Sequence, residues 1–155
     1  MTEKPSQDLV VGASSAIAGA LIERWSKEAF RPITAVSRSL ADVHSLSALK
    51  GVNAYQSDYS DESLQSMTTE LLDGGIDINR LIVCNGVLQG EGYRPERALN
   101  QLEVSAMRDV FEANTFTPMR VLAALWCVRR ASSLKLVCTA PRCPIQTTME
   151  TSPSE

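Results

Sequence analysis

The chain has 155 residues, of which 44% are hydrophobic and 21% are charged, the size and composition of a single globular domain. A net charge of -3 without a basic block argues against a nucleic-acid-binding protein, and the apolar runs are shorter than the roughly 18 residues of a membrane span. The N-terminus lacks the apolar segment of a secretory signal, and the four cysteines include no Cys-x-x-Cys pair. We therefore expect a cytoplasmic protein with reduced thiols and, because it has a single histidine, no metal site.

Short β-branched runs alternate with helical patterns along the chain. Strands are expected at residues 9–12, 33–37, 52–56, 81–84 and 134–138. Helices are expected at residues 15–30, 39–50, 60–72 and within 98–130, the last as a short piece followed by a long one. Ser39 and Asp42 stand in capping-box register, and Ser60 precedes two acids that suit a helix N-terminus. This order predicts an α/β fold: a doubly wound, Rossmann-type parallel sheet of about five strands in a three-layer α/β/α arrangement.

The last part of the sequence differs from the rest in composition. Residues 139–155 contain three prolines, four threonines and few large apolar side chains. Such a segment favours a loop or a disordered tail over a packed element. We therefore expect one α/β domain over residues 1–138, incomplete at its C-terminal end, and an irregular or disordered tail over 139–155.

A turn of small residues joins the first expected strand to the first expected helix. Residues 10–19 read Val-Val-Gly-Ala-Ser-Ser-Ala-Ile-Ala-Gly. Such a turn lets backbone N–H groups approach a pyrophosphate, and the positive end of the helix dipole would stabilise the anion. The alternative is an ordinary tight turn. The candidate cofactor-binding residues at this turn are Gly12, Ser14, Ser15, Ala16 and Ile17.

The turn resembles the Gly-x-x-x-Gly-x-Gly motif of the short-chain dehydrogenases/reductases. Gly12 matches the first glycine, while Ala16 and Ala18 stand at the places of the other two. Residues 81–88, Leu-Ile-Val-Cys-Asn-Gly-Val-Leu, resemble the family's Asn-Asn-Ala-Gly segment, with Asn85 at the alanine and Gly86 at the final glycine. The resemblance covers roughly residues 8–140. It implies that Asn85 and Gly86 line the cofactor.

The end of the second expected strand bears on which dinucleotide is bound. NAD-binding folds commonly place an acid there, which bonds the ribose 2′-hydroxyl. Here Ser37 and Arg38 occupy the place, and both can bind a 2′-phosphate that an acid would repel. We therefore predict NADP rather than NAD, with Arg38 as a solvated loop residue as the alternative. The resemblance implies that Asp58 meets the adenine ring, although a turn or cap role would also explain this residue.

Pro118 lies inside the long helical segment. It cannot donate to the carbonyl of Asn114, so the sequence predicts a kink and an acceptor without its helical partner. The resemblance implies that this carbonyl of Asn114 holds a water of the family's catalytic proton relay. A plain proline kink with a buried asparagine is the alternative.

The helix after this proline is apolar on nearly all sides over residues 119–128, so it requires cover on two faces. One face would meet the sheet. Because relatives associate through this helix, the resemblance implies a homo-oligomer formed through residues 104–130. Full burial inside a monomer is the alternative.

The resemblance implies an NADP-dependent oxidoreductase that interconverts a small carbonyl and an alcohol by hydride transfer. Relatives use a Tyr-x-x-x-Lys pair as acid and base, but here no tyrosine follows Tyr93 and no lysine follows Lys135. We therefore expect the N-terminal, cofactor-binding portion of such an enzyme, truncated before that motif and inactive by itself. Two alternatives are a non-catalytic NADP-binding sensor or regulatory module and a truncated product without function.

Overall fold

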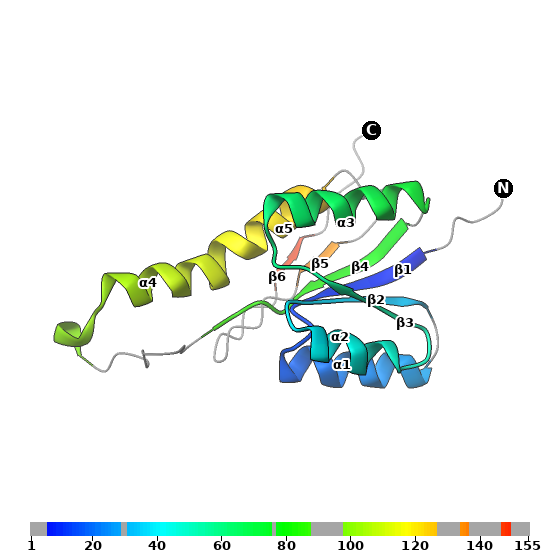
Figure 1. Ribbon diagram of the computed structural model, residues 1–155, viewed down its shortest axis with the longest axis horizontal. Coiled ribbons are helices and arrows are strands. Elements are labelled where there is room, and N and C mark those ends of the chain that lie inside the picture. The colour runs from blue at the N-terminus through cyan, green and yellow to red at the C-terminus, as the bar shows by residue number, and fades with distance from the viewer. Residues whose placement is uncertain are drawn as a thin grey trace.

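The computed structural model of the chain describes residues 6–28, 31–75, 77–87, 98–126, 134–136 and 147–149. A parallel sheet forms its centre, made of β1 (Ser6–Val11), β2 (Ile33–Ser37), β3 (Val52–Gln56) and β4 (Asp77–Val83). The strand order is β3-β2-β1-β4, and each neighbouring pair is parallel (Figure 1). The predicted α/β architecture with a doubly wound parallel sheet is confirmed.

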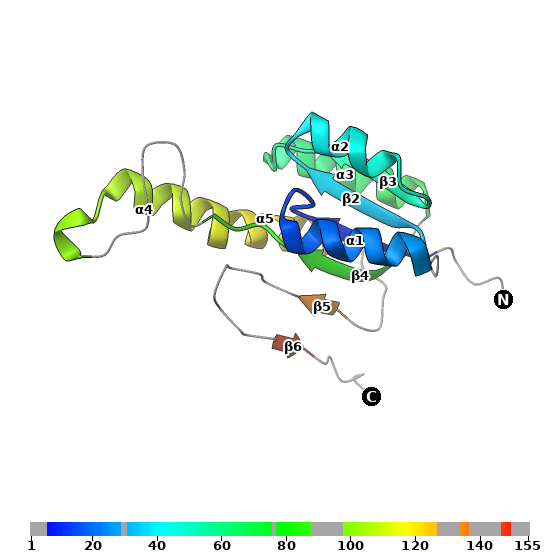
Figure 2. The ribbon, with the colours of Figure 1, turned by 90° about the horizontal axis from the view of Figure 1, so that it is seen from below.

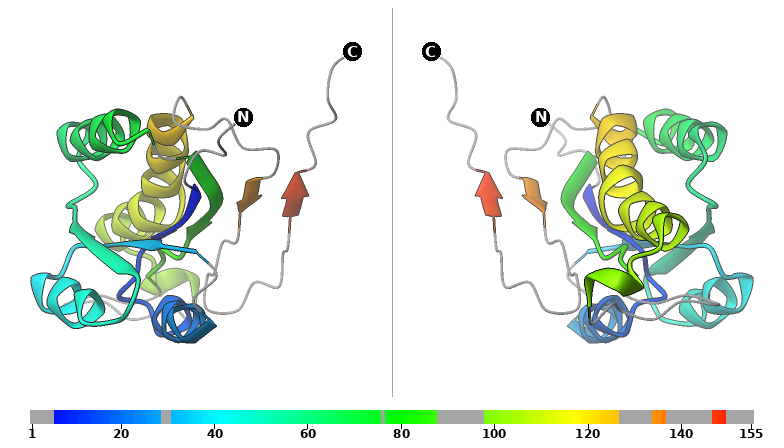
Figure 3. Two further views of the ribbon diagram at one scale, coloured as in Figure 1. Left: turned by 90° about the vertical axis from the view of Figure 1, so that its right-hand side faces the viewer. Right: turned by 90° about the vertical axis from the view of Figure 1, so that its left-hand side faces the viewer.

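Helices cover both faces of this sheet, and the central strands are therefore buried on both sides. Every residue of β2 is buried, as expected for a strand inside a parallel sheet. On one face, Leu9 and Val11 of β1 pack with Leu64 of α3 (Asp61–Asp73) and Val121 of α5 (Thr117–Leu125). On the other face, Val10 packs with residues of α1 (Ala16–Glu28) and α2 (Leu40–Ser47). Figure 3 shows the resulting three layers.

Two of these helices begin as their sequences predict. The Ser39 hydroxyl accepts a hydrogen bond from the Asp42 backbone N–H at 3.3 Å, and the Ser60 hydroxyl accepts one from the Ser63 N–H at 3.3 Å. Each serine therefore satisfies one backbone donor that the first turn of a helix leaves without a partner. The caps fix the points at which α2 and α3 leave the carboxyl end of the sheet.

The segment before α5 confirms the expected short helical piece followed by a long one. A 3-10 turn, η1 (Leu99–Gln101), precedes α4 (Val104–Phe111), and a π-helical turn, η2 (Glu112–Phe116), joins α4 to α5. The Thr117 N–H donates to the Glu112 carbonyl, five residues back. The predicted irregularity at Pro118 therefore takes the form of a π turn, after which the proline stands in the first turn of α5, where its missing N–H costs little. The continuous helix carries α4 well away from the sheet (Figure 1).

The expected fifth parallel strand is different in the structure. Strand β5 (Leu134–Leu136) lies beside β4, but it pairs antiparallel with β6 (Thr147–Met149) in a separate sheet (Figure 2). In the described parts of the chain, the parallel sheet thus has four strands rather than about five. Strand β6 also lies within residues 139–155, where we expected irregular structure. Its two β-branched threonines favour a strand, and this preference does not reveal the pairing partner.

The amino end of the sheet is fixed by a buried ion pair. The carboxylate of Asp8 is 1% exposed and accepts hydrogen bonds from the Arg80 guanidinium and from the Asn79 amide. The guanidinium also lies over the Trp25 ring, 4.0 Å from its centroid. The hydrogen bond to Asp8 raises the pKa of Arg80, so the cation persists at any ordinary pH. Of the helices that the structure describes, none could cross a membrane by its length and apolar character.

Candidate functional site

A cleft of about 200 Å³ opens at the carboxyl ends of β1 and β4. The strand order reverses between these two strands, and in doubly wound sheets ligands bind outside the carboxyl ends at this switch point. The cleft brings together six residues that the sequence analysis selected: Gly12, Ser14, Ser15, Arg38, Asn85 and Gly86. Segments far apart in the sequence therefore converge on the place where the turn was predicted to hold an anion.

Gly12 packs directly against the chain that follows β4. Its φ is +78°, and a Cβ at this position would lie 2.7 Å from the Asn85 backbone nitrogen and 2.7 Å from the Cys84 carbonyl carbon. The N–H groups of Gly12 and Ala13 both donate to the Val36 carbonyl, at 3.0 and 2.9 Å. Only glycine combines this left-handed backbone with so close an approach. The turn is thus tied to β2 on one side and to the end of β4 on the other.

The N-terminus of α1 follows this turn. The Ser15 hydroxyl accepts a hydrogen bond from the Ala18 N–H at 3.1 Å, so Ser15 acts as the helix cap. Ser14 is exposed at the cleft. Ala16 and Ile17 are exposed on the first helical turn, beside the described cleft lining rather than within it. The first N–H groups of a helix and its dipole together make this end attractive to an anion.

Ser37 and Arg38 at the end of β2 occupy different environments. Arg38 is exposed and lines the cleft, and its backbone carbonyl accepts a hydrogen bond from the Gln56 amide at 3.2 Å. The Ser37 side chain is 1% exposed. Its hydroxyl donates to Asp42 Oδ2 at 3.3 Å and accepts from the Ser39 N–H at 3.2 Å. Arg38 therefore faces the cleft, while the Ser37 hydroxyl forms its hydrogen bonds with Asp42 and Ser39.

Asp58 forms a turn at the end of β3. Its carboxylate accepts a hydrogen bond from the Ser60 N–H at 2.9 Å, and this bond lowers the pKa of Asp58. The side chain is exposed and lies outside the described lining of the cleft. This geometry is the turn role that the sequence analysis gave as the alternative, and the adenine contact stays a prediction.

Tyr59 is a site residue that the sequence analysis missed. It is 4% exposed, and its φ of +64° is rare for a residue with a side chain. Its hydroxyl donates to the Val36 carbonyl at 3.4 Å, beneath the Gly12 turn. Burial raises the pKa of Tyr59 above its ordinary 10.0, partly opposed by hydrogen bonds from Asn85 and Gly12. The buried Tyr59 hydroxyl thus binds the same Val36 carbonyl that accepts hydrogen bonds from the Gly12 turn.

Asn85 presents an acceptor without a protein partner in the described part of the chain. Its Oδ1 is buried, and it would lie 2.9 Å from a Cβ at position 12. Buried polar atoms in native proteins nearly always have a hydrogen-bond partner, and the exceptions need an explanation. A ligand donor in the cleft would supply one, so this atom fits a bound polar molecule.

Asn114 joins the helix to the segment after β4. Its Oδ1 accepts from the Val87 N–H at 2.7 Å, and its Nδ2 donates to the Val87 carbonyl at 2.8 Å. The neighbouring helical residues Ala113 and Thr117 line the cleft. The side chain of Asn114 is therefore a two-point clamp, a role the sequence did not indicate, while the relay role of its carbonyl stays a prediction.

Solved structures share this arrangement of strands and helices. A short-chain dehydrogenase/reductase from Saccharomyces cerevisiae aligns with a TM-score of 0.65 and 20% identity, over 79% of this chain and 48% of its own. A short-chain dehydrogenase from Streptomyces avermitilis gives 0.62 and 22%, over 81% and 44%. A double mutant of a Serratia marcescens short-chain dehydrogenase/reductase gives 0.66 and 14%, over 92% and 59%. The chain has the short-chain dehydrogenase/reductase fold.

This chain spans about half the length of the solved structures with the short-chain dehydrogenase/reductase fold. Neither a protein-family model nor a curated protein matches its sequence. Within this fold, the Gly12 turn and the Asn85–Gly86 segment line the same cleft. The contribution of Tyr59 depends on a side chain that reaches from the segment after β3 to β2. In the described segments, no group of three His, Cys, Asp or Glu residues could hold a metal ion.

Proposed function

We propose that this chain is the cofactor-binding portion of a short-chain dehydrogenase/reductase and that its cleft binds NADP(H). The observation that carries the proposal is the Gly12 turn, whose backbone packs against Asn85 with no room for a Cβ, directly before the N-terminus of α1. This combination suits the pyrophosphate of a dinucleotide. Ser14, Ser15, Ala16 and Ile17 would surround the phosphates, and Gly86 would allow close approach of the cofactor.

The Oδ1 of Asn85, which has no hydrogen-bond partner among the described residues, supports a polar ligand in the same cleft. The exposed guanidinium of Arg38 supports a dinucleotide with a 2′-phosphate, because guanidinium binds phosphate strongly. Asp58 would contact the adenine at the edge of this site. When bound, NADP(H) would supply hydride chemistry toward a small carbonyl or alcohol. The residues of this chain would bind and orient it, with Asn114 in the proton relay, and the lack of a Tyr-x-x-x-Lys pair in this sequence supports binding without turnover.

A titration with NADPH, followed by its fluorescence, tests this proposal. We expect saturable binding to the full chain and weaker NADPH binding by Arg38→Ala, with NADH affinity changed little. Arg24→Ala is the matched control, because Arg24 is an exposed residue of α1 paired with Glu28. No binding of either dinucleotide at millimolar concentration would refute the proposal. Equal losses for NADPH and NADH in Arg38→Ala would refute the assignment of Arg38 to the 2′-phosphate.

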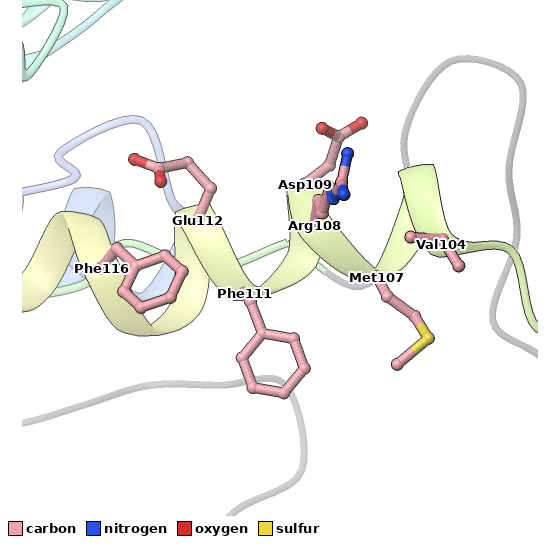
Figure 4. Close-up of a pocket in the computed structure, with 7 residues that line it drawn as sticks. All are labelled: Val104, Met107, Arg108, Asp109, Phe111, Glu112 and Phe116. Carbon is pink, nitrogen blue, oxygen red and sulfur yellow. The ribbon is translucent and has the colours of Figure 1, made fainter.

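We also propose that two copies of the chain associate through the α4–α5 helix. An apolar stripe runs along the outer face of this helix, formed by Val104, Met107, Phe111 and Phe116. Figure 4 shows Met107 and Phe111 pointing to one side of the helix, while Arg108 and Asp109 point to the opposite side. Contiguous exposed apolar surface of this kind commonly marks an interface.

A further inference from the structure

The Tyr59 hydroxyl determines which end of the Asn85 side-chain amide is left for the cleft. Tyr59 donates its proton to the Val36 carbonyl at 3.4 Å, so the phenolic oxygen can only accept a further hydrogen bond. The Asn85 side chain forms a hydrogen bond with Tyr59, and only the Nδ2 group of an amide can donate one. The Oδ1 of Asn85 is therefore directed away from the phenolic oxygen and has no partner among the described residues.

This buried acceptor lies directly beside the Gly12 turn. Asn85 Oδ1 would be 2.9 Å from a Cβ at position 12, and Gly12, Tyr59 and Asn85 all line the same cleft. The Gly12 turn is where we propose that the pyrophosphate binds. An ionised pyrophosphate has no proton to donate to Oδ1, whereas the hydroxyl groups of the two riboses attached to it can donate one. A ribose hydroxyl is thus the nearest group of the dinucleotide that satisfies this acceptor.

We propose that Tyr59 is a positioning residue, which holds Asn85 Oδ1 ready to accept a hydrogen bond from a ribose hydroxyl of the bound dinucleotide. The inference rests on the proposed function, because it concerns the same cleft. It does not follow from the family motif, since Asn85 stands at the alanine of the Asn-Asn-Ala-Gly segment and alanine has no side-chain acceptor. Without the Tyr59 hydroxyl, the amide would be free to rotate, and the acceptor would face the ligand only part of the time.

The test measures the NADPH affinity of the full chain, of Tyr59→Phe, of Asn85→Ala and of the double variant. We expect Asn85→Ala to weaken binding roughly fivefold, the effect of one neutral hydrogen bond, and Tyr59→Phe to weaken it roughly threefold. In the Asn85→Ala background, Tyr59→Phe should cause no further loss, because Tyr59 acts through the amide. A purely structural role of Tyr59 would weaken binding by the same factor in both backgrounds.

The Tyr59→Phe variant is expected to fold, because phenylalanine keeps the buried ring. The Val36 carbonyl also keeps the hydrogen bonds from the Gly12 and Ala13 N–H groups. An independent measurement uses the wild type alone: the NMR signals of the Asn85 side-chain amide should shift when NADPH is added. Signals that stay in place at saturating NADPH would overturn the contact between Asn85 and the ligand.

The same set of variants also shows which ribose is bound. The molecule 2′,5′-ADP carries the ribose of the adenosine half and lacks the nicotinamide ribose. A loss of affinity in Tyr59→Phe for both 2′,5′-ADP and NADPH supports a hydroxyl of the adenosine ribose. A loss for NADPH alone supports a hydroxyl of the nicotinamide ribose.

Tyr55→Phe is the matched control. It removes the same hydroxyl from a tyrosine of β3 that bonds to Glu70 at 3.3 Å and lies outside the described lining of the cleft, so NADPH affinity should stay at the wild-type value. NADPH binding that Tyr59→Phe leaves unchanged, or weakens equally in both backgrounds, would overturn the role of Tyr59 and leave the proposed function standing. Failure of the wild type to bind either dinucleotide would overturn the proposed function, and the role of Tyr59 with it.

Discussion

Gly12 and Gly19 lie seven residues apart in a segment rich in small residues, yet their surroundings in the structure are opposite. Gly12 has a positive φ and backbone atoms at 2.7 Å from the place of a Cβ. Gly19 lies inside α1, and nothing stands within 4 Å of its Cβ position. The first glycine is required by packing. The second only weakens a helix, because glycine has a low helix propensity.

We therefore predict that Gly12→Ala destabilises the chain by about 1–3 kcal/mol, the range for a backbone forced from its required conformation. Gly19→Ala should stabilise it by about 0.5–1 kcal/mol through better helix propensity. Urea unfolding followed by circular dichroism measures both. Similar unfolding midpoints for Gly12→Ala and the wild type would contradict the close packing of this turn on Asn85.

At the residue scale, the sequence predicts those site residues whose place follows from the order of strands and turns. Gly12, Arg38 and Asn85 each follow the carboxyl end of a strand, and these ends meet at one edge of a parallel sheet. Tyr59 and the bond from Ser37 to Asp42 could not be predicted. They depend on side-chain directions and on a positive φ at a residue that rarely adopts one.

At the scale of elements, local signals decide where helices begin, while contacts between residues distant in sequence decide which strands pair. Ser39 and Ser60 mark the first turns of α2 and α3 by cap chemistry that lies within four residues. The pairing of β5 with β6 depends on contacts between separate segments, so the strand propensity of residues 134–138 could not reveal it. Pro118 predicts an irregular helix but does not specify that the irregularity is a π turn.

The clamp from Asn114 to Val87 shows what that helix contributes to the site. We predict that Asn114→Leu destabilises the chain by about 1–3 kcal/mol, because it leaves the N–H and the carbonyl of Val87 without partners. The Val87 amide should also exchange its hydrogen faster, which NMR measures directly. Thr115→Ala is the control, as Thr115 is exposed on the same turn. Unchanged exchange at Val87 would count against the clamp.

At the scale of the whole molecule, the two ends of the sheet hold different polar groups. At the amino end, the buried Asp8 carboxylate is paired with Arg80 and Asn79. At the carboxyl end, Arg38 is exposed and the buried Asn85 Oδ1 has no partner among the described residues. Gln7 Nε2 at the amino end is also buried without a partner among the described residues, so the proposed ligand site at the carboxyl end depends on the cleft rather than on an unpartnered atom alone. The alternation of strands and helices predicts that the cleft lies at the carboxyl end of the sheet, because all its parallel strands point the same way.

The long helix also exposes apolar side chains in the part of the chain that the structure describes. Phe111 is 52% exposed and Phe116 is 54% exposed along a helix that extends past the sheet (Figure 1). These exposures support the proposed association of two copies.

We predict that the wild type is a dimer at micromolar concentration in sedimentation velocity and that Phe111→Glu is a monomer, because a charge at the centre of the apolar stripe would be buried without a partner on association. Leu72→Glu is the control, since it adds the same charge to an exposed leucine of α3, away from the stripe, and it should leave the dimer intact. Neither substitution changes a buried side chain, so the free energy of unfolding of the dissociated chain should shift by no more than about 0.5 kcal/mol. If the wild type sediments as a monomer, or if Leu72→Glu dissociates it as readily as Phe111→Glu, the stripe is not the interface.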